Sequence, residues 1–145
     1  MEINPREINI GMLSVEQISG LKTQHEEELR GLQQQLETLH GAKNRFINAR
    51  STLDDIKSSS DGAPLLIPLN GSLYVPGRIV DSGKVVVELG TGYFCEKTVP
   101  AAKDLIDRKT QLVTSSIDSV ASIGERKRKN LEQIMAVMTY KLQQN

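Results

Sequence analysis

The sequence is poor in the residues that build large cores and covalent cross-links. Its 145 residues include no Trp, two Phe, three Tyr and one cysteine. Because aromatic side chains bury the largest apolar areas, so few of them do not predict a large globular core. Cys95 has no partner for an internal disulfide, which is typical of a reduced, cytosolic protein.

An excess of charge of either sign is also missing. The 18 basic and 18 acidic residues give a formal net charge of zero, which removes the usual electrostatic reason to expect nucleic acid or an anionic membrane as the partner. No apolar run approaches the roughly 20 residues of a membrane span, nor does a signal sequence stand out. We therefore expect a cytoplasmic protein whose partners are other proteins.

Residues that would form a catalytic, metal or nucleotide site do not gather in the sequence. His25 and His40 are the two histidines, and Cys95 has no neighbouring His, so no set of metal ligands or nucleophile with its base is expected. The run Gly90-Thr91-Gly92 lacks the third glycine and the Lys-Ser or Lys-Thr of a phosphate-binding loop. We predict that the protein is not an enzyme and has no cofactor.

A long amphipathic helix is predicted over residues 14–58, after a lead-in at residues 1–13. Ser14 and Gln17 have the spacing of a capping box, and apolar residues then recur in steps of three and four. The stripe that they form is narrow, which is typical of a coiled-coil seam facing one partner helix. Its members are Ile18, Leu21, His25, Leu29, Leu32, Leu36, Leu39, Lys43, Phe46, Arg50 and Leu53.

The composition of residues 64–97 changes to Leu, Ile, Val and Tyr punctuated by glycine. Asn70-Gly71 and Asp81-Ser82-Gly83 are predicted to be the turns of two hairpins, and Gly90-Thr91-Gly92 a turn into the last strand. We expect four short strands in two hairpins.

A second helix is predicted over residues 98–143, capped by Thr98 with Pro100 in its first turn. If Lys57 lies opposite Thr98, antiparallel pairing with the first helix places the acidic run 26–28 against the basic run 127–129.

The predicted fold class is therefore α+β, a single domain over residues 1–145. It is a long antiparallel α-helical coiled-coil hairpin with two β-hairpins inserted between the helices. The second stripe consists of Ile106, Thr110, Val113, Ile117, Val120, Gly124, Lys127, Leu131, Ile134 and Met138.

Antiparallel pairing brings the chain termini together at one tip, which is rich in apolar residues. A thin hairpin cannot bury them all, exposed apolar surface usually marks an interaction site, and methionine adapts to varied partners. For Leu131, Ile134 and Met138, packing in the seam and exposure are both open. Exposure is favoured for Ile8, Ile10, Met12 and Tyr140. The candidate interaction residues of the tip are Ile8, Ile10, Met12, Leu13, Ile18, Leu131, Ile134, Met135, Met138 and Leu142.

The β segment has apolar residues and strand edges that one coiled coil cannot cover. We therefore expect an oligomer joined through its strands. The candidate assembly residues are Leu66, Leu69, Leu73, Val75, Val85, Val87, Leu89 and Tyr93.

Three stretches of this segment resemble the alpha class of prefoldin subunits, which is marked by a four-stranded insert. They are Leu65-Leu66-Ile67-Pro68-Leu69, Ser72-Leu73-Tyr74-Val75-Pro76-Gly77 and Val87-Glu88-Leu89-Gly90-Thr91-Gly92-Tyr93-Phe94-Cys95-Glu96-Lys97-Thr98. The lead into the first helix, Leu13-Ser14-Val15-Glu16-Gln17-Ile18, is also similar. The resemblance covers nearly the whole chain and is strongest over residues 65–109.

The resemblance implies a hexamer of two alpha-class and four beta-class prefoldin subunits, joined by their strands, with clients bound at the tips of the arms. It further implies an ATP-independent holdase that captures unfolded nascent actin and tubulin and passes them to the group II chaperonin. The alternative is a prefoldin-like scaffold subunit in a transcription-related or assembly complex. An additional nuclear pool beside the cytoplasmic one stays open in both cases. The basic run 126–129 favours this alternative if it is a nuclear-import or nucleic-acid patch rather than the counterpart of the acidic run.

Overall fold

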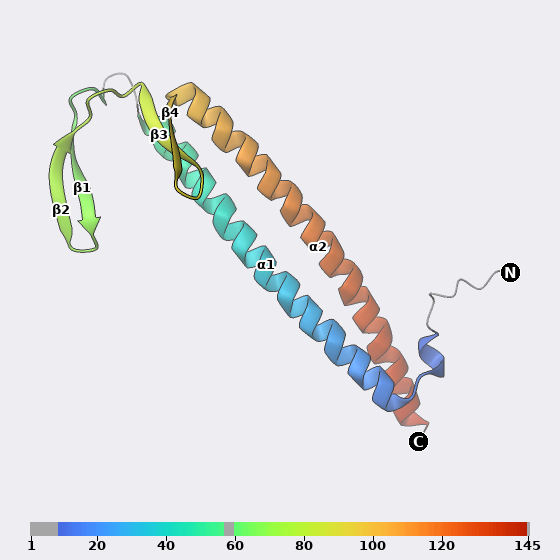
Figure 1. Cartoon of the computed structure of the whole chain (residues 1–145). Coiled ribbons are helices and arrows are strands. Elements are labelled where there is room, and N and C mark those ends of the chain that lie inside the picture. The colour runs from blue at the N-terminus through green and yellow to red at the C-terminus, as the bar shows by residue number, and fades with distance from the viewer. Residues whose placement is uncertain (1–8, 57–59, 145) are drawn as a thin grey trace. The chain divides into compact units, whose positions relative to one another are not determined.

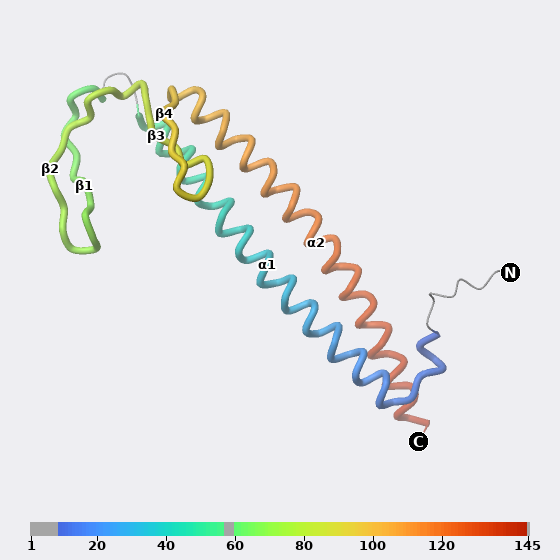
Figure 2. The backbone as a smooth tube through the Cα atoms, viewed as in Figure 1, coloured from blue at the N-terminus to red at the C-terminus, as the bar shows by residue number. Residues whose placement is uncertain are grey.

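The computed structural model describes residues 9–56 and 60–144. In chain order its elements are the 3₁₀ turn η1 (Ile10–Met12), α1 (Val15–Asp55), β1 (Pro64–Asn70), β2 (Leu73–Arg78), β3 (Lys84–Gly90), β4 (Tyr93–Thr98) and α2 (Val99–Gln143) (Figure 1). The tube in Figure 2 follows the chain from α1 through both hairpins into α2. The predicted fold class, two long helices with two β-hairpins between them in the sequence, is confirmed.

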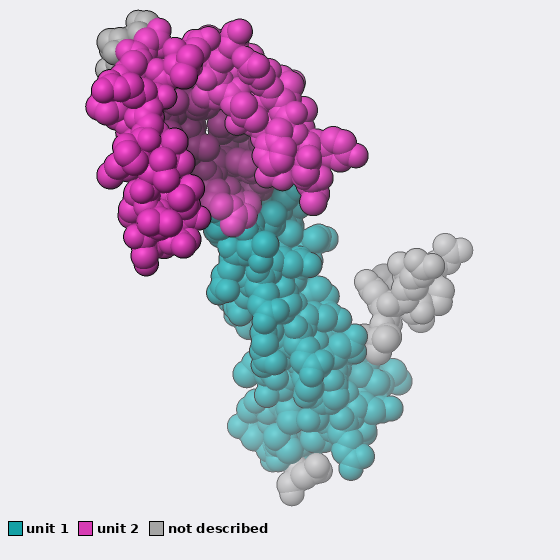
Figure 3. All heavy atoms as spheres, turned by 60° about the vertical axis from the view of Figure 1, so that its left-hand side comes forward, with its two compact units in different colours: residues 1–41, 115–145 teal, residues 42–114 magenta. Residues whose placement is uncertain are grey.

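The chain divides into two compact units, and both long helices contribute to each (Figure 3). Residues 1–41 and 115–145 make up the first, which we call the terminal unit. Residues 42–114 make up the second, which contains all four strands and which we call the strand unit.

Both long helices begin where the sequence predicts, because side chains bind the first free amide groups. The Ser14 N–H donates to Gln17 Oε1 at 3.0 Å and the Gln17 N–H donates to Ser14 Oγ at 3.2 Å, which is a reciprocal capping box. At α2 the Ala101 N–H donates to Thr98 Oγ1 at 3.3 Å. The predicted end of the first helix at residue 58 lies outside the described residues.

The lead-in contains an element that the sequence did not predict. Asn9 caps the short turn η1, since its Oδ1 accepts a hydrogen bond from the Gly11 N–H at 3.1 Å. The signal was the Asx residue just before Ile10, which is weak because asparagine also initiates ordinary turns.

The number of strands is as expected, but the predicted second hairpin was wrong. β1 pairs with β2, and β3 pairs with β4 through the turn at Gly90-Thr91-Gly92, where Gly92 has a φ of 79° that favours glycine. Asp81-Ser82-Gly83 is instead a link between the hairpins. It turns because Asp81 Oδ1 accepts the Gly83 N–H at 2.8 Å.

Among the described residues, one small apolar cluster and a few separate buried side chains replace a large core. In the strand unit, Leu53, Ala102 and Ile106 are buried, and β3 covers them with Val85 and Val87. In the terminal unit the buried residues are Ile18, Ile117 and Ile134. All six helical positions lie on the predicted stripes or, for Ala102, one turn before the second stripe begins.

Leu53→Ala should destabilise the isolated chain by about 3 kcal/mol, because it opens a cavity in the cluster of the strand unit. The matched control is Ile47→Ala on the same helix, whose side chain is 48% exposed and whose truncation should cost less than about 1 kcal/mol. Urea unfolding followed by helical circular dichroism measures both. Equal effects of the two substitutions would contradict this assignment of the core.

Candidate assembly and client-binding surfaces

In the terminal unit, hydrogen bonds and ion pairs hold the helices antiparallel. Lys127 donates to the Glu28 carboxylate, and Lys141 donates to the carbonyl oxygen of Leu13. The Lys127 ammonium, followed by Gln24, holds the pKa of Glu28 below its ordinary value. The pairing of Glu28 with Lys127 confirms the predicted register at this position.

The other two charge pairs expected across the helices do not form. Glu26 lies 3.4 Å from Lys22 on its own helix. Arg128 binds Glu125 and Glu132, at 2.7 Å and 2.5 Å, also within its own helix. The prediction was wrong here because partners three or four residues away along one helix are always within reach and compete with the opposite helix.

The strand unit has a compact charge network between its helices. Arg50 lies 3.0 Å from Asp107 and 3.1 Å from Asp54, and Lys103 lies 2.7 Å from Asp54. The Lys103 ammonium is the main cause of the lowered pKa of Asp54. These contacts also show that the helices are antiparallel, because Arg50 pairs with Asp107, whereas Asp54, later on α1, pairs with Lys103, earlier on α2.

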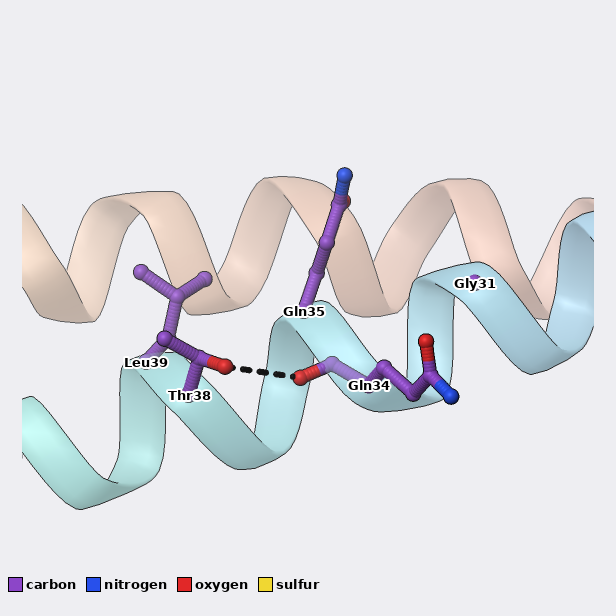
Figure 4. Close-up of a pocket in the computed structure, with 5 residues that line it drawn as sticks. All are labelled: Gly31, Gln34, Gln35, Thr38 and Leu39. Atoms are coloured by element: carbon purple, nitrogen blue, oxygen red, sulfur yellow. Dashed lines mark hydrogen bonds between the residues drawn. The ribbon is translucent and has the colours of Figure 1, made fainter.

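A hollow on the terminal unit is lined by one helix. Its residues are Gly31, Gln34, Gln35, Thr38 and Leu39, all on α1, and the Thr38 hydroxyl donates to the carbonyl oxygen of Gln34 at 3.1 Å (Figure 4). A Cβ added at Gly31 would meet nothing within 4 Å, so the hollow exists because glycine leaves the helix surface bare. No convergent acid, base or nucleophile lines it.

The sequence-predicted tip residues that the structure describes fall into three groups by exposure. Ile18 and Ile134 are 0% and 2% exposed, so they pack between the helices. Met12, Met135 and Leu142 are exposed, with Met12 at 85%. Ile10, Leu13, Leu131 and Met138 are half-buried, and Ile8 lies outside the described residues. We call Met12, Met135, Met138, Tyr140 and Leu142 the terminal surface.

The position of Met12 depends on a contact that sequence reasoning missed. Lys141 binds the carbonyl oxygen of Leu13, and Asn9 caps η1 from its other side. Together these contacts tie η1 to α2 and leave the Met12 side chain in solvent. A lysine near a helix C-terminus is too common for the sequence to single out Lys141.

The predicted assembly residues also differ in exposure. Val85 and Val87 are half-buried because they pack on the core of the strand unit. The others are exposed, from 42% for Val75 to 75% for Tyr93, and β1–β2 has apolar side chains on both faces. We call the exposed members the assembly surface: Leu66, Leu69, Leu73, Val75, Leu89 and Tyr93.

The described residues hold neither a cluster of metal ligands nor a helix that could span a membrane. Within residues 9–56 and 60–144, no three His, Cys, Asp or Glu side chains are grouped so as to hold a metal ion. No helix in that part of the chain has the length and hydropathy to cross a membrane.

Comparison with known proteins identifies the family. Residues 25–144 match the family described as prefoldin subunit. The chain is 35% identical to a probable prefoldin subunit 5 of Dictyostelium discoideum, over 97% of this chain and 88% of that protein. It is 33% identical to prefoldin subunit 5 of Homo sapiens, over 94% and 89% of the two chains. For prefoldin subunit 5 of Arabidopsis thaliana the identity is 34%, over 91% and 87%.

The fold has a counterpart among solved structures. A chain of the filamentous PFD from Methanocaldococcus jannaschii superposes with a TM-score of 0.70, covering 79% of this chain and 95% of its own, at 17% identity. The chain therefore belongs to the prefoldin family. Its relatives are named as prefoldin subunits 5, in agreement with the resemblance found in the sequence.

An aspartate holds the link between the two hairpins. Asp61 Oδ1 accepts the Ser82 N–H at 2.6 Å, and Ser82 is buried. The Ser82 backbone bond, and then its hydroxyl, lower the pKa of Asp61. A lowered pKa means that this bond stabilises the fold above the ordinary aspartate value of 3.8 and that its contribution is lost as the pH falls through the lowered value.

The Ser82 amide proton should therefore report the titration of Asp61, with a chemical shift that changes below pH 3.8. NMR of the isolated chain measures this shift. In Asp61→Asn the side-chain oxygen can still accept the bond, so the shift should stay near its neutral-pH value and lose its pH dependence. A Ser82 shift that titrates equally in the variant would show that another group is responsible.

Proposed function

We propose that the chain is a subunit of a heterohexameric prefoldin with two alpha-class and four beta-class subunits. The complex acts as an ATP-independent holdase in the cytosol. It captures unfolded nascent proteins such as actin and tubulin at the tips of its helical arms and delivers them to the group II chaperonin. The observation that carries this proposal is the similarity to prefoldin subunit 5 along 91–97% of the chain.

The terminal surface supports client binding. Met12, Met135 and Leu142 are exposed at 85%, 46% and 54%, and unfolded chains offer apolar side chains in many different arrangements. Flexible thioether side chains adapt to such varied partners better than branched or aromatic ones. Ile18 and Ile134 are already buried, so in this account they hold the helices together and do not touch the client.

The assembly surface supports the role of the β segment. The six exposed apolar side chains of the assembly surface lie within one short segment. In a monomer they would promote unspecific association, because large exposed apolar patches bind other apolar surfaces. Coverage by neighbouring subunits removes this apolar area from water, at about 25 cal/mol for each Å² buried.

The scaffold alternative is less favoured, because two of the four basic residues that suggest it are paired within the chain. Its best evidence was the basic run 126–129, but Lys127 binds Glu28 and Arg128 binds Glu125 and Glu132. A side chain already paired with a carboxylate is a poor contact for a phosphate or an import receptor. The holdase is therefore the function that we favour.

Leu73→Asp should reduce incorporation of the chain into the hexamer about tenfold or more, because a buried charge would have no partner. Leu73 is 54% exposed in the free chain, so the helices should still form. Val87→Asp is a poorer test, since Val87 packs against the chain's own core. Leu112→Asp, at a helix position 70% exposed, is the control and should assemble normally. Incorporation of Leu73→Asp at the level of the control would exclude Leu73 from the interface.

The double variant Met12→Ser, Met135→Ser should hold unfolded clients about tenfold less well once assembled, because two apolar contacts are lost. Light scattering after dilution of denatured actin into the assembled complex measures this. Leu112→Ser removes an exposed apolar side chain from the strand unit and should leave holding unchanged. Unchanged holding by the double variant, in a complex of normal mass, would mean that the terminal surface of this subunit does not contact the client.

A further inference from the structure

The β3–β4 hairpin lies against the two helices of the strand unit. Val85 and Val87 on β3 are half-buried and pack on the buried cluster of that unit, whereas residues 84, 86 and 88 on the same strand are exposed. This alternation is typical of a strand with one face on a core and the other in solvent. β1 shows no such alternation, because all of its residues are exposed.

The base of the β3–β4 hairpin is fixed where β4 continues into α2. The Val99 N–H donates to the Gly83 carbonyl oxygen at 3.1 Å, so β3 and α2 start from the same level. From there Glu88 is about 17 Å away along β3, and Lys109 is about 15 Å away along α2, given the rise per residue of a strand and of a helix. The two residues can therefore meet only if the hairpin runs along the helix.

The far end of the hairpin is held by Lys109. Its Nζ donates to the Glu88 carbonyl oxygen at 3.2 Å and lies 6.0 Å from the centroid of the Phe46 ring on α1. Lys109 and Phe46 are both half-buried, and Phe46 packs on the cluster of the strand unit. Lys109 has no carboxylate partner among the described residues. One ammonium group therefore joins β3, α1 and α2 without forming an ion pair.

Glu88 connects this contact to the turn of the hairpin. Its carbonyl oxygen is bound by Lys109, and its side-chain Oε1 accepts the Gly92 N–H at 3.4 Å. Leu89 and Tyr93, two members of the assembly surface, lie on either side of this turn. A contact that holds Glu88 in place therefore also holds the exposed side chains at the end of the hairpin.

We propose that Lys109 is a positioning residue for assembly, which keeps the β3–β4 hairpin along the helices of the free chain. Leu89 and Tyr93 then reach a neighbouring subunit in a fixed arrangement. Preorganised contacts bind more tightly, because the loss of conformational freedom occurs before binding. This inference rests on the proposed function, because it assumes that the partners are prefoldin subunits.

Substitutions at Lys109 test the inference. Lys109→Met keeps an apolar side chain of similar length and removes the ammonium group. Lys109→Arg keeps a charged donor that also stacks on aromatic rings, so it should retain the contact. Arg108→Met is the matched control, because Arg108 is the neighbouring cation and is exposed.

Hydrogen exchange in the free chain measures the position of the hairpin. Val87 and Cys95 face each other on β3 and β4. They form a hydrogen-bonded pair, by antiparallel alternation from the Val99 bond to Gly83. In Lys109→Met their amides should exchange about fivefold faster, because one hydrogen bond that holds the hairpin is lost. Lys109→Arg and Arg108→Met should match the wild type.

Two results of the exchange experiment would overturn the inference. One is an unchanged rate at Val87 and Cys95 in Lys109→Met. The other is an equal increase along both helices and β1–β2, since that would show that Lys109 stabilises the whole fold and does not position the hairpin.

Competition between wild type and variant measures the effect on assembly. Both chains are co-expressed with the other prefoldin subunits of their organism, and native mass spectrometry gives the share of each in the complex. Lys109→Met should take a share about fivefold smaller than the wild type, and Lys109→Arg and Arg108→Met should take equal shares. An equal share for Lys109→Met would contradict a role in assembly. A wild-type chain that enters no complex would overturn the proposed function, and the exchange experiment distinguishes this outcome because it uses the free chain alone.

Discussion

Each long helix has apolar side chains along one narrow stripe, and burial of that stripe against the other helix is what the rest of the structure depends on. Few apolar side chains of the described residues are buried: Ile18, Ile117 and Ile134 in the terminal unit, and Leu53, Ala102 and Ile106 in the strand unit. A helix with so narrow a stripe cannot be buried among several neighbours, so it pairs with one. Each unit therefore buries few side chains and leaves most of its residues in contact with solvent.

Polar contacts set the register and the ends of this pairing. Lys127 pairs with Glu28, and Lys103 pairs with Asp54. Apolar residues in steps of three and four would fit several registers of one helix against the other, and these two pairs select one of them. The carbonyl of Leu13, held by Lys141, fixes where the chain enters the pairing. The β segment has the opposite character, since most of its large apolar side chains are exposed.

The helices and their starts could be predicted from the sequence because their signals are local. The capping box of Ser14 and Gln17, the Thr98 cap and the apolar stripes each involve residues a few positions apart. The second hairpin was mispredicted because Asp81-Ser82-Gly83 has the composition of a hairpin turn. Its role as a link depends on Asp61, which is distant in sequence. The charge pairs between the helices were also mispredicted. Arg128 has acidic residues within reach on its own helix as well as on the opposite one, and the sequence does not show which of them it binds.

Of the candidate surfaces, the sequence could indicate composition but not exposure. The apolar tip residues were recognisable in the sequence. Ile134 is buried and its neighbour Met135 is exposed, because adjacent residues on a helix point in different directions, and the rotation of α2 decides which of them faces α1.

We propose that this chain works as one subunit of a prefoldin hexamer that holds unfolded proteins. Native mass spectrometry of the chain co-expressed with beta-class prefoldin subunits, with and without unfolded actin, tests this most directly. We expect a mass equal to two alpha-class and four beta-class subunits, increased by the mass of the client when actin is added. A monomer or homodimer whose mass does not change with actin would contradict it.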